Sequence, residues 1–396
     1  MNELFTKLAE KYHFSVDAVE ALHEVYGTDL EGVLQSIKKP SDRFFSRVNT
    51  LKLSTQELID SFVSKGVDVS SFDLIDEAVF TPIKGPFEFS EVEKKIVIDK
   101  FTAESVLQGS HIYAPGTVNC SKLRKGDMVT IVDRHGQVVG VGRMRMSETE
   151  ILNVRRGLAV EVTSPLYSAV SLRESEEYEL GYVYPQSLPA MITSRVLDPL
   201  EGETIVDLNC SPGGKLSHIS QLMQNQGRVI GVDRNVKKVD VARRTIERLG
   251  CKNVSLFPHD SRYFDVDYPD LKADKVLVDP PCSALGHVPQ LYSEISKKDI
   301  LDLSAYQKQF LKSASRIIKD NGTIIYSVCT VTRQECEDVC TYAVDELGLE
   351  IEEQGLRLGR GGMKNFVVNA SFLQRFDPHK HGIGYFIARF RKKNHA

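Results

Sequence analysis

The sequence predicts an α/β protein, with a doubly wound, mainly parallel sheet in the C-terminal half and a smaller β-rich domain before it. Strand patterns alternate with helical patterns between about residues 185 and 390, which favours a parallel sheet. Residues 92–164 carry short alternating runs separated by Gly, Pro, Asn and Asp, a pattern typical of a β-barrel or sandwich. The chain has 396 residues, enough for two or three domains of roughly 150 residues each.

Composition limits the class of protein. Hydrophobic residues make up 41% of the chain, which suits packed cores and excludes a disordered chain. The N-terminal segment MNELFTKLAEKYHF is amphipathic and acidic, unlike a signal peptide, and no apolar run approaches the ~18 residues of a membrane span. Seven cysteines without a CxxC pair or zinc spacing indicate reduced thiols and no metal site. We therefore expect a cytoplasmic protein without membrane contact.

Residues 1–91 are predicted to form an N-terminal helical and RRM-like region. Two short helical patterns come first, ended by Gly27 and Pro40. A strand at RFFSRVNTLK, an amphipathic helix at TQELIDSFVSKG and a strand at LIDEAVFTPI follow, which together make a small β-α-β unit.

The β-rich domain is predicted at residues 92–164. Its strands are expected at KKIVIDKF, HIYAPGTV, GDMVTIVD and QVVGVGRMRM. Only FTAESVLQGS has a helical pattern there, and Gly109 is placed to cap it.

Residues 165–396 are predicted to hold a linker and the parallel sheet. The strands are expected at TIVDL, RVIGVD, VSLFP, KVLVD and TIIYSV. The helices between them are expected at GKLSHISQLM, KKVDVARRTIERLG and LSAYQKQFLKSASRIIKD. The late apolar run GIGYFIARF suits an antiparallel edge strand beside the parallel ones.

The loop after the first strand of this sheet suggests a nucleotide cofactor. TIVDL runs into NCSPGGK, where a glycine pair lets the backbone approach a ligand and the next helix offers free N–H groups. The loop matches neither GxGxxG nor the Walker pattern. Asp233 ends the second strand, where a carboxylate suits a ribose diol, and Asp260 ends the third, within expected reach of an adenine amino group. Strand-end aspartates also cap turns, but Asp207, Asp233 and Asp260 in register favour an adenosine cofactor.

Two cysteines follow the fourth and fifth strands. Cys282 lies in KVLVDPPCSALG, where the Pro-Pro pair stiffens the turn, and Cys329 lies in GTIIYSVCTVT. Because those strands are neighbours in most doubly wound sheets, both thiols and Asp279 are expected to face one crevice. Cys336 and Cys340 are one helical turn apart and are expected to pack in the core.

A thiol, an acid and an adenosine cofactor together fit methylation of carbon 5 of cytosine. A thiolate that adds to carbon 6 makes carbon 5 nucleophilic toward a sulfonium methyl group, and an acid near N3 stabilises the developing charge. A base then removes the carbon-5 proton and the thiol leaves. Two alternatives stay open: an exocyclic-amine methyltransferase, in which an aromatic residue usually stands where Cys282 is, and an RNA-binding protein or chaperone with a silent catalytic domain.

These residues resemble the Sun-type (Nop2/Sun) RNA cytosine-5 methyltransferases over nearly the whole chain. The segments that carry the resemblance are RVNTLK, QSLPAM, DLNCSPGGK, DPPCSALG and YSVCT. FTAESVLQGSHIYAPG and KGDMVTIV resemble a PUA domain, and its insertion, with LQRFDP and GIGYFIARF, is similar to the branch that methylates the tRNA acceptor stem. The resemblance implies a Rossmann-like S-adenosylmethionine-dependent domain with a seven-stranded sheet, an RRM-like N-terminal part and an inserted PUA β-barrel.

The resemblance also implies residue roles. Cys329 would be the nucleophile, Cys282 would assist product release as or near the base, Asp279 would bind the cytosine edge, and Lys215 would line the same pocket. S-adenosylmethionine would lie against Asn209, Cys210, Ser211, Pro212, Gly213, Gly214, Lys215, Asp233, Lys238, Asp260 and Asp279. The departures from the family pattern are Asn209, Cys210, Leu216, Ala284 and Val328.

The implied partner is a tRNA with its CCA end, and no obligate protein partner is expected. Gly109, Tyr113 and Pro115 would receive the single-stranded CCA end, with Tyr113 stacking on a base. The net charge of −4 gives no support for RNA binding, so local basic clusters must supply it, such as the one at Lys122 or the one from Arg389 to Lys393. The last pair before CCA frays most easily, which favours the cytosine at position seventy-two. The alternative is a ribosomal RNA cytosine-5 methyltransferase.

Overall fold

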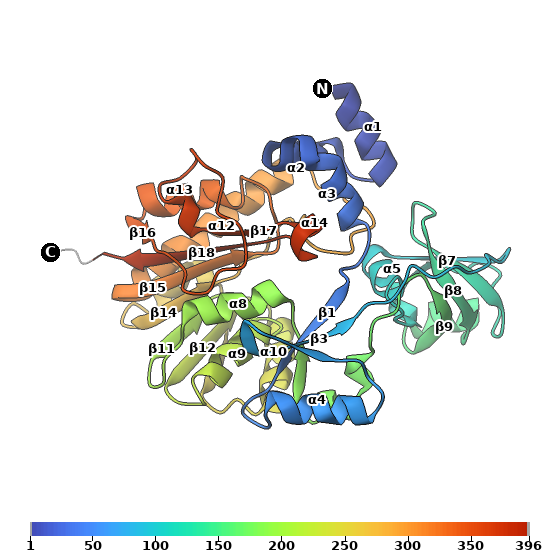
Figure 1. Ribbon diagram of the computed structural model, residues 1–396, viewed down its shortest axis with the longest axis horizontal. Coiled ribbons are helices and arrows are strands. Elements are labelled where there is room, and N and C mark those ends of the chain that lie inside the picture. The colour runs from blue at the N-terminus through green and yellow to red at the C-terminus, as the bar shows by residue number, and fades with distance from the viewer. Residues whose placement is uncertain (1, 394–396) are drawn as a thin grey trace.

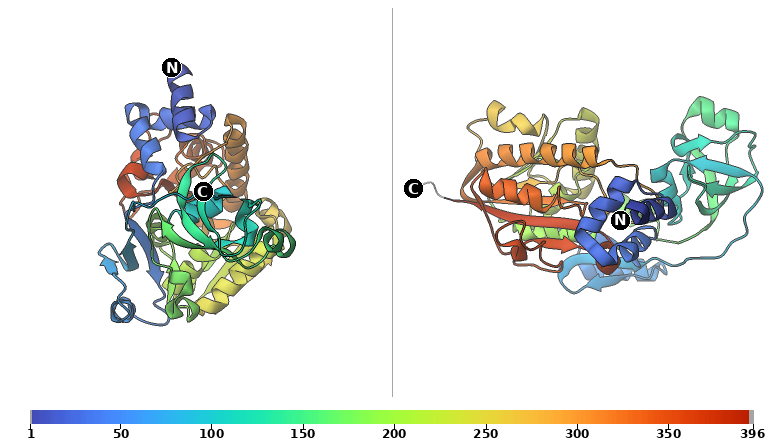
Figure 2. Two further views of the ribbon diagram at one scale, coloured as in Figure 1. Left: turned by 90° about the vertical axis from the view of Figure 1, so that its right-hand side faces the viewer. Right: turned by 90° about the horizontal axis from the view of Figure 1, so that it is seen from above.

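The computed structural model describes residues 2–393, which form a sheet-based body with a separate small β-domain at the end opposite the C-terminus (Figures 1 and 2). A large sheet runs β13-β12-β11-β14-β15-β18-β16, and β17 pairs with β18, so the sheet has eight strands instead of the seven that the resemblance implies. Its strands are β11 (Thr204–Asp207), β12 (Arg228–Asp233), β13 (Val254–Pro258), β14 (Ala273–Val278), β15 (Ile318–Val328), β16 (Leu349–Ile351), β17 (Gln374–Phe376) and β18 (Tyr385–Lys392). The first five are parallel, and β18 runs antiparallel to β15, as the sequence predicts. The expected edge position of β18 is wrong, because it lies between β15 and β16.

Helices cover both faces of this sheet, so the doubly wound prediction is confirmed. The helices are α8 (Leu188–Leu197), α9 (Gly214–Leu222), α10 (Val236–Leu249), α12 (Lys297–Ile317) and α13 (Glu337–Asp345). One apolar core joins α8, α9 and α10 to Ile205, Leu277 and Ile325. The other joins α12 and α13 to Val206 and Val276, which point to the opposite face because side chains alternate along a strand.

A second, antiparallel sheet runs β10-β1-β3-β2. It consists of β1 (Arg43–Val48), β2 (Ser70–Phe72), β3 (Ile75–Pro82) and β10 (Val183–Pro185), with α4 (Thr55–Ser64) between β1 and β2. The edge strand β10 follows the small β-domain in the chain, so the N-terminal unit extends beyond residue 91 into the segment predicted as a linker. Three residues are too few to give a periodic strand signal. The RRM-like description of this unit stays a prediction.

Buried polar contacts fasten this sheet to the large one. Arg47 on β1, only 1% exposed, donates to the carbonyl of Gly214 (2.6 Å) and to Ser217 Oγ (2.7 Å) at the start of α9. Glu77 on β3 bonds to Arg195 of α8 and to His218 of α9, whose Nε2 lies 2.7 Å from Glu77 Oε1. The N-terminal sheet therefore holds the start of the helix that follows the predicted cofactor loop.

Three helices form the N-terminal cap: α1 (Asn2–Tyr12), α2 (Val16–Tyr26) and α3 (Leu30–Ile37). The sequence predicts the first two, and Gly27 ends α2 as expected. Helix α3 was not predicted, although Leu30, Val33, Leu34 and Ile37 have helical spacing and are buried. The cap packs on Leu285, Ile300 and Val331 of the large body.

The small β-domain forms a six-stranded sheet in the order β5-β9-β8-β7-β4-β6. Its elements are β4 (Lys95–Ile98), α5 (Lys100–Val106), β5 (Ile112–Tyr113), β6 (Thr117–Asn119), β7 (Met128–Val132), β8 (Val138–Met144), α6 (Glu148–Val154) and β9 (Leu158–Pro165). Helix α5 ends at Val106 with Leu107 as its C-cap, and the predicted cap, Gly109, lies two residues further on in the following turn, in the left-handed region (φ +98). Helix α6 was missed, although Ser147 and Glu150 form a capping box readable in SETE.

The segment after β14 docks this domain onto the large body. Leu291 and Tyr292 are 4% and 6% exposed and belong to the core of the small domain. The Leu291 N–H donates to Glu104 Oε1 of α5 (3.0 Å), and Gln137 Nε2 donates to the Leu291 carbonyl (3.1 Å). No helix between residues 2 and 393 has the length and apolar character needed to cross a membrane.

The Glu104 carboxyl at this junction gives a pH-dependent prediction. Burial raises its pKa to about 7, against the opposing effect of Lys100 and Lys38. A raised pKa in the folded state means that stability is lost as the pH rises through that value. Glu104→Gln keeps an acceptor for Leu291 and stays neutral, so its unfolding free energy lacks this pH dependence. Between about pH 5.5 and 8.5, the unfolding free energy of wild type should therefore fall by about 2 kcal/mol relative to that of the variant. Urea unfolding across this pH range measures the difference, and parallel curves for the two proteins would contradict it.

Candidate active site

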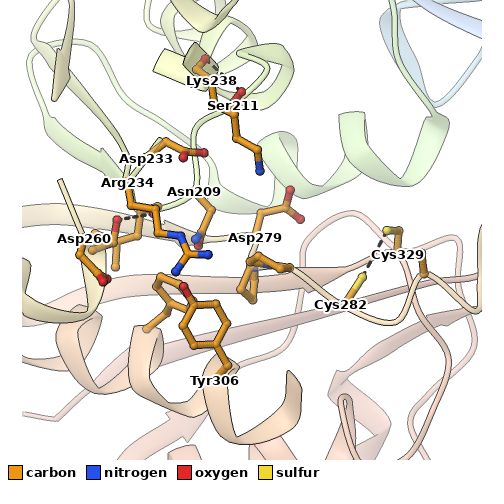
Figure 3. A pocket seen from close by; sticks show the side chains of 16 residues that line it. Asn209, Ser211, Asp233, Arg234, Lys238, Asp260, Asp279, Cys282, Tyr306 and Cys329 are labelled. Atoms are coloured by element: carbon orange, nitrogen blue, oxygen red, sulfur yellow. Dashed lines mark hydrogen bonds between the residues drawn. The ribbon is translucent and has the colours of Figure 1, made fainter. Parts of the chain in front are cut away.

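A cavity of about 290 Å³ opens at the carboxyl ends of the parallel strands (Figure 3). Its walls come from the loops after β11, β12, β13, β14 and β15, together with α12. The sequence-predicted residues that line it are Asn209, Ser211, Asp233, Lys238, Asp260, Asp279, Cys282 and Cys329. The strand-end rule for ligand sites in α/β sheets therefore located the cavity correctly.

One half of the cavity has groups that fit a nucleoside. Asp233 lies at the end of β12 and Asn209 at the end of β11, and both face the cavity (Figure 3). Asn209 Oδ1 is buried and has no hydrogen-bond partner within residues 2–393, so it can accept from a ligand. Asp260 instead bonds both carboxylate oxygens to Arg262, which lowers the pKa of Asp260. If Asp260 bound an adenine amino group, its carboxylate would have to accept from that group and from Arg262 at the same time.

The glycine loop has a packing role that the sequence did not indicate. Gly213 adopts φ +102, and a Cβ there would come within 3.2 Å of Thr245 on α10. A Cβ on Gly214 would lie 2.9 Å from the ring of Tyr184 on β10. Cys210 is 3% exposed and lies in the core with α8 and α9, and burial raises the pKa of its thiol. Cys210, Pro212, Gly213 and Gly214 hold the loop in place but are not among the described residues that line the cavity.

The two predicted cysteines meet at the other end of the cavity. Strands β14 and β15 are parallel neighbours with Val278 opposite Tyr326, so the loops that follow them leave the sheet side by side. Cys282 Sγ and Cys329 Sγ are 3.3 Å apart, within hydrogen-bond distance (Figure 3). Both thiols are partly exposed, whereas Cys336 and Cys340 are buried in the core, as expected. All seven cysteines are free.

The contact between the thiols makes them unequal. The hydrogen bond from Cys282 lowers the pKa of Cys329, although burial and the charge of Asp279 oppose this. The same bond, with burial, raises the pKa of Cys282 well above its usual value. Of the two thiols, Cys329 is therefore the one that loses its proton more readily, and Cys282 is the one that keeps it. A thiolate is the nucleophilic form of cysteine.

Asp279 is the centre of a polar cluster beside the thiols. Lys215 Nζ donates to Asp279 Oδ2 (2.7 Å), and Ser327 Oγ and the Tyr385 hydroxyl donate to Oδ1 (2.7 and 3.3 Å). Although burial opposes it, the negative charge of Asp279 raises the pKa of Lys215, so the ammonium group stays protonated. Lys215 does not line the cavity itself and reaches it through Asp279.

Several wall residues were missed by sequence reasoning. Tyr306 and Phe310 come from α12, and Arg234 follows Asp233; all three line the cavity. The guanidinium groups of Arg234 and Arg262 lie 5.9 and 5.0 Å from the Tyr306 ring centre. Their positions follow from helix packing, which leaves no local motif. Ser327 at the end of β15, which donates to Asp279, was missed as well, although it lies only two residues before Cys329.

The predicted RNA-binding residues lie in the small β-domain. Tyr113 on β5 is 55% exposed, Pro115 lies in the turn Ala114–Gly116, and Lys122 is exposed. None of the described residues that line the cavity comes from this domain. The basic cluster near the C-terminus is compensated by acids: Arg389 and Arg391 pair with Glu352, and Lys393 pairs with Glu350. Its contribution to an RNA-binding surface is correspondingly reduced.

Two protein families match the chain. The model described as "16S rRNA methyltransferase RsmB/F" matches residues 194–391, half of the chain, and a PUA-domain model matches residues 94–166. The second match overlaps the β-rich domain predicted at 92–164. The first covers the large sheet and every wall of the cavity.

Relatives with known names match over nearly the full length. A tRNA (cytosine(72)-C(5))-methyltransferase from Pyrococcus horikoshii is 37% identical, over 98% of this chain and 97% of the relative. The human enzyme of that name, NSUN6, is 28% identical over 91% of each chain. The crystal structure of NSun6 from P. horikoshii with SFG, an analogue of S-adenosylmethionine, superposes with a TM-score of 0.88 at 36% identity, covering 97% of this chain and 99% of that one. The chain therefore belongs to the RsmB/F family of S-adenosylmethionine-dependent methyltransferases and carries an inserted PUA domain.

Proposed function

We propose that this enzyme forms 5-methylcytosine at position 72 of tRNA, in the acceptor stem next to the CCA end. The observation that carries the proposal is the pair of thiols 3.3 Å apart, next to Asp279 and a cavity suited to a nucleoside. The full-length relatives named for cytosine 72 support the substrate, since their match includes the PUA domain. The human 28S rRNA (cytosine(4447)-C(5))-methyltransferase matches only 57% of this chain.

The cavity supports S-adenosylmethionine as methyl donor through its own residues. Asp233 would accept hydrogen bonds from the ribose hydroxyls, and Asn209 Oδ1, which has no partner among the described residues, would accept another. Tyr306 and Phe310 offer aromatic faces on the same wall. When bound, the cofactor supplies an electrophilic methyl group on sulfur.

Cys329 would begin the reaction. Its thiolate adds to carbon 6 of the cytosine, and the electron pair of the 5,6 double bond moves into the ring toward N3. Asp279 can accept a hydrogen bond from the exocyclic amino group, and the Lys215 ammonium beside it can stabilise the negative charge that builds on the ring. Carbon 5 then carries enough electron density to take the methyl group.

Cys282 would act in the second half of the reaction. Once carbon 5 is methylated, its proton must leave to a base near Cys282, because the Cys282 thiol itself stays protonated, and the bond between Cys329 and carbon 6 must break. The Cys282 thiol lies 3.3 Å from the departing sulfur and can donate a hydrogen bond to it. Loss of this donor slows elimination more than addition.

The nucleophile is tested by Cys329→Ser. A serine hydroxyl stays protonated at neutral pH, so methyl transfer to tRNA should fall by at least about a thousandfold. Radiolabelled methyl incorporation measures this, and calorimetry should show unchanged cofactor affinity. Cys120→Ala, at a buried cysteine of the PUA domain, is the matched control. Full activity in Cys329→Ser would exclude thiol catalysis.

The role of Cys282 predicts a trapped intermediate. Cys282→Ala should accumulate a covalent protein–RNA complex that survives denaturing electrophoresis, because addition proceeds and elimination stalls. The double variant Cys282→Ala/Cys329→Ser should form no such complex. An adduct that persists in the double variant would assign the bond to another residue.

The substrate is tested with tRNA transcripts that differ at one place. Changing cytosine 72 to uridine or removing the CCA end should each abolish methylation, and mass mapping of the unchanged transcript should find the methyl group on carbon 5. Methylation at N4 would indicate exocyclic-amine chemistry. Unchanged activity without CCA would favour a ribosomal RNA substrate.

A further inference from the structure

A buried carboxylate, that of Glu335, contacts the loops that carry the two thiols, and the mechanism proposed above does not use it. Glu335 is 0% exposed and lies between β15 and α13. Each of its oxygens accepts several hydrogen bonds, and the donors come from both cysteine loops and from α12. Carboxylates with this degree of burial need such a set of donors to stay charged.

The contacts of Glu335 divide by oxygen. Oε1 accepts from two N–H donors, the Ser283 backbone (2.9 Å) and Gln307 Nε2 (3.0 Å). Oε2 accepts from three hydroxyls, those of Ser283, Thr332 (2.9 Å) and Thr330 (3.3 Å). Ser283 and Thr330 are the residues directly after Cys282 and Cys329, and their hydroxyl oxygens are 2.7 Å apart.

Gln307 ties the other side of the Cys282 loop. Its Nε2 also donates to the Pro281 carbonyl (3.0 Å), and its Oε1 accepts from the Tyr326 hydroxyl (2.9 Å). The Tyr326 hydroxyl in turn lies 2.6 Å from the backbone carbonyl of Glu335. The residues before and after Cys282 are thus held by one network anchored on Glu335.

We propose that Glu335 is a positioning residue: it holds the Cys282 and Cys329 loops in contact and keeps the shared proton on Cys282, so that Cys329 is the thiolate. The geometric part follows from its bonds to the residues after both cysteines. The electrostatic part follows from its negative charge, which adds to the rise in the pKa of Cys282, while Lys215 and the Cys282 hydrogen bond favour charge on Cys329. The inference rests on the proposed thiol mechanism.

Glu335→Gln separates charge from geometry. Gln can keep Oε1 toward the two N–H donors and turn its amide nitrogen toward the three hydroxyls, which can accept as well as donate. This variant should fold, yet it removes the charge that disfavours a thiolate on Cys282. Glu335→Ala removes both the charge and the bonds. Glu337→Gln is the matched control, because Glu337 is equally buried two residues along and bonds to Arg375 instead of the cysteine loops.

The direct readout is iodoacetamide labelling of the free enzyme from about pH 6 to 9, with Cys282 and Cys329 quantified by peptide mass spectrometry. In wild type, Cys329 should label first. In Glu335→Gln, the ratio of Cys329 to Cys282 labelling should fall by about tenfold, the change of one pKa unit. kcat should fall by a similar factor while KM for cofactor and tRNA holds. Glu337→Gln should keep the wild-type labelling ratio.

An unchanged labelling ratio and kcat in Glu335→Gln would overturn the proposal, as would an equal change in Glu337→Gln. A loss of thermal stability alone would assign Glu335 a purely structural role and overturn it too. These outcomes are separate from failure of the thiol mechanism, which would appear as full activity in Cys329→Ser. Labelling needs no RNA, so it tests the role of Glu335 even if tRNA is not the substrate.

Discussion

The active site depends on the parallel pairing of β14 with β15. This pairing puts Val278 opposite Tyr326, so the chain leaves both strands at one level and brings Cys282 and Cys329 within 3.3 Å. Thiols so close titrate as a coupled pair, and their surroundings decide which sulfur loses its proton first. Lys215 and the donor Cys282 favour charge on Cys329, and Glu335 opposes charge on Cys282.

The other domains act on this site through the loops that carry it. The N-terminal sheet holds the start of α9 through Arg47, and α9 carries Lys215 to Asp279. The segment after Cys282 continues to Leu291 and Tyr292, which lie in the core of the PUA domain. A domain inserted far upstream in the chain therefore packs on the catalytic loop itself. RNA held by the PUA domain would meet a cavity whose wall is tied to that domain.

Local sequence patterns predicted most of the fold, because the periodicity of a strand or helix and the residues of a turn reflect the backbone conformation of that segment. The five parallel strands, the antiparallel β18 and the turn at Gly109 all have periodicity or turn chemistry within a few residues. The strand β10 was missed because its three residues have no period and owe their pairing to β1. Helices α3 and α6 were missed despite readable apolar spacing and a capping box. In the glycine loop, the need for small residues comes from Thr245 and Tyr184, which lie far away in sequence.

The sequence by itself determined which groups the reaction can use: two strand-end cysteines, the aspartate before the first of them, and a loop with acids for an adenosine cofactor. Chemistry limits which side chains can perform such a step, so their types and strand-end positions were informative. Only the tertiary structure decided their states. Two of these states depend on distances of a few ångströms between segments far apart in the chain: which thiol loses its proton more readily, and why Lys215 stays protonated. Burial and proton sharing depend on those distances, because electrostatic effects change steeply over a few ångströms in a low-dielectric site.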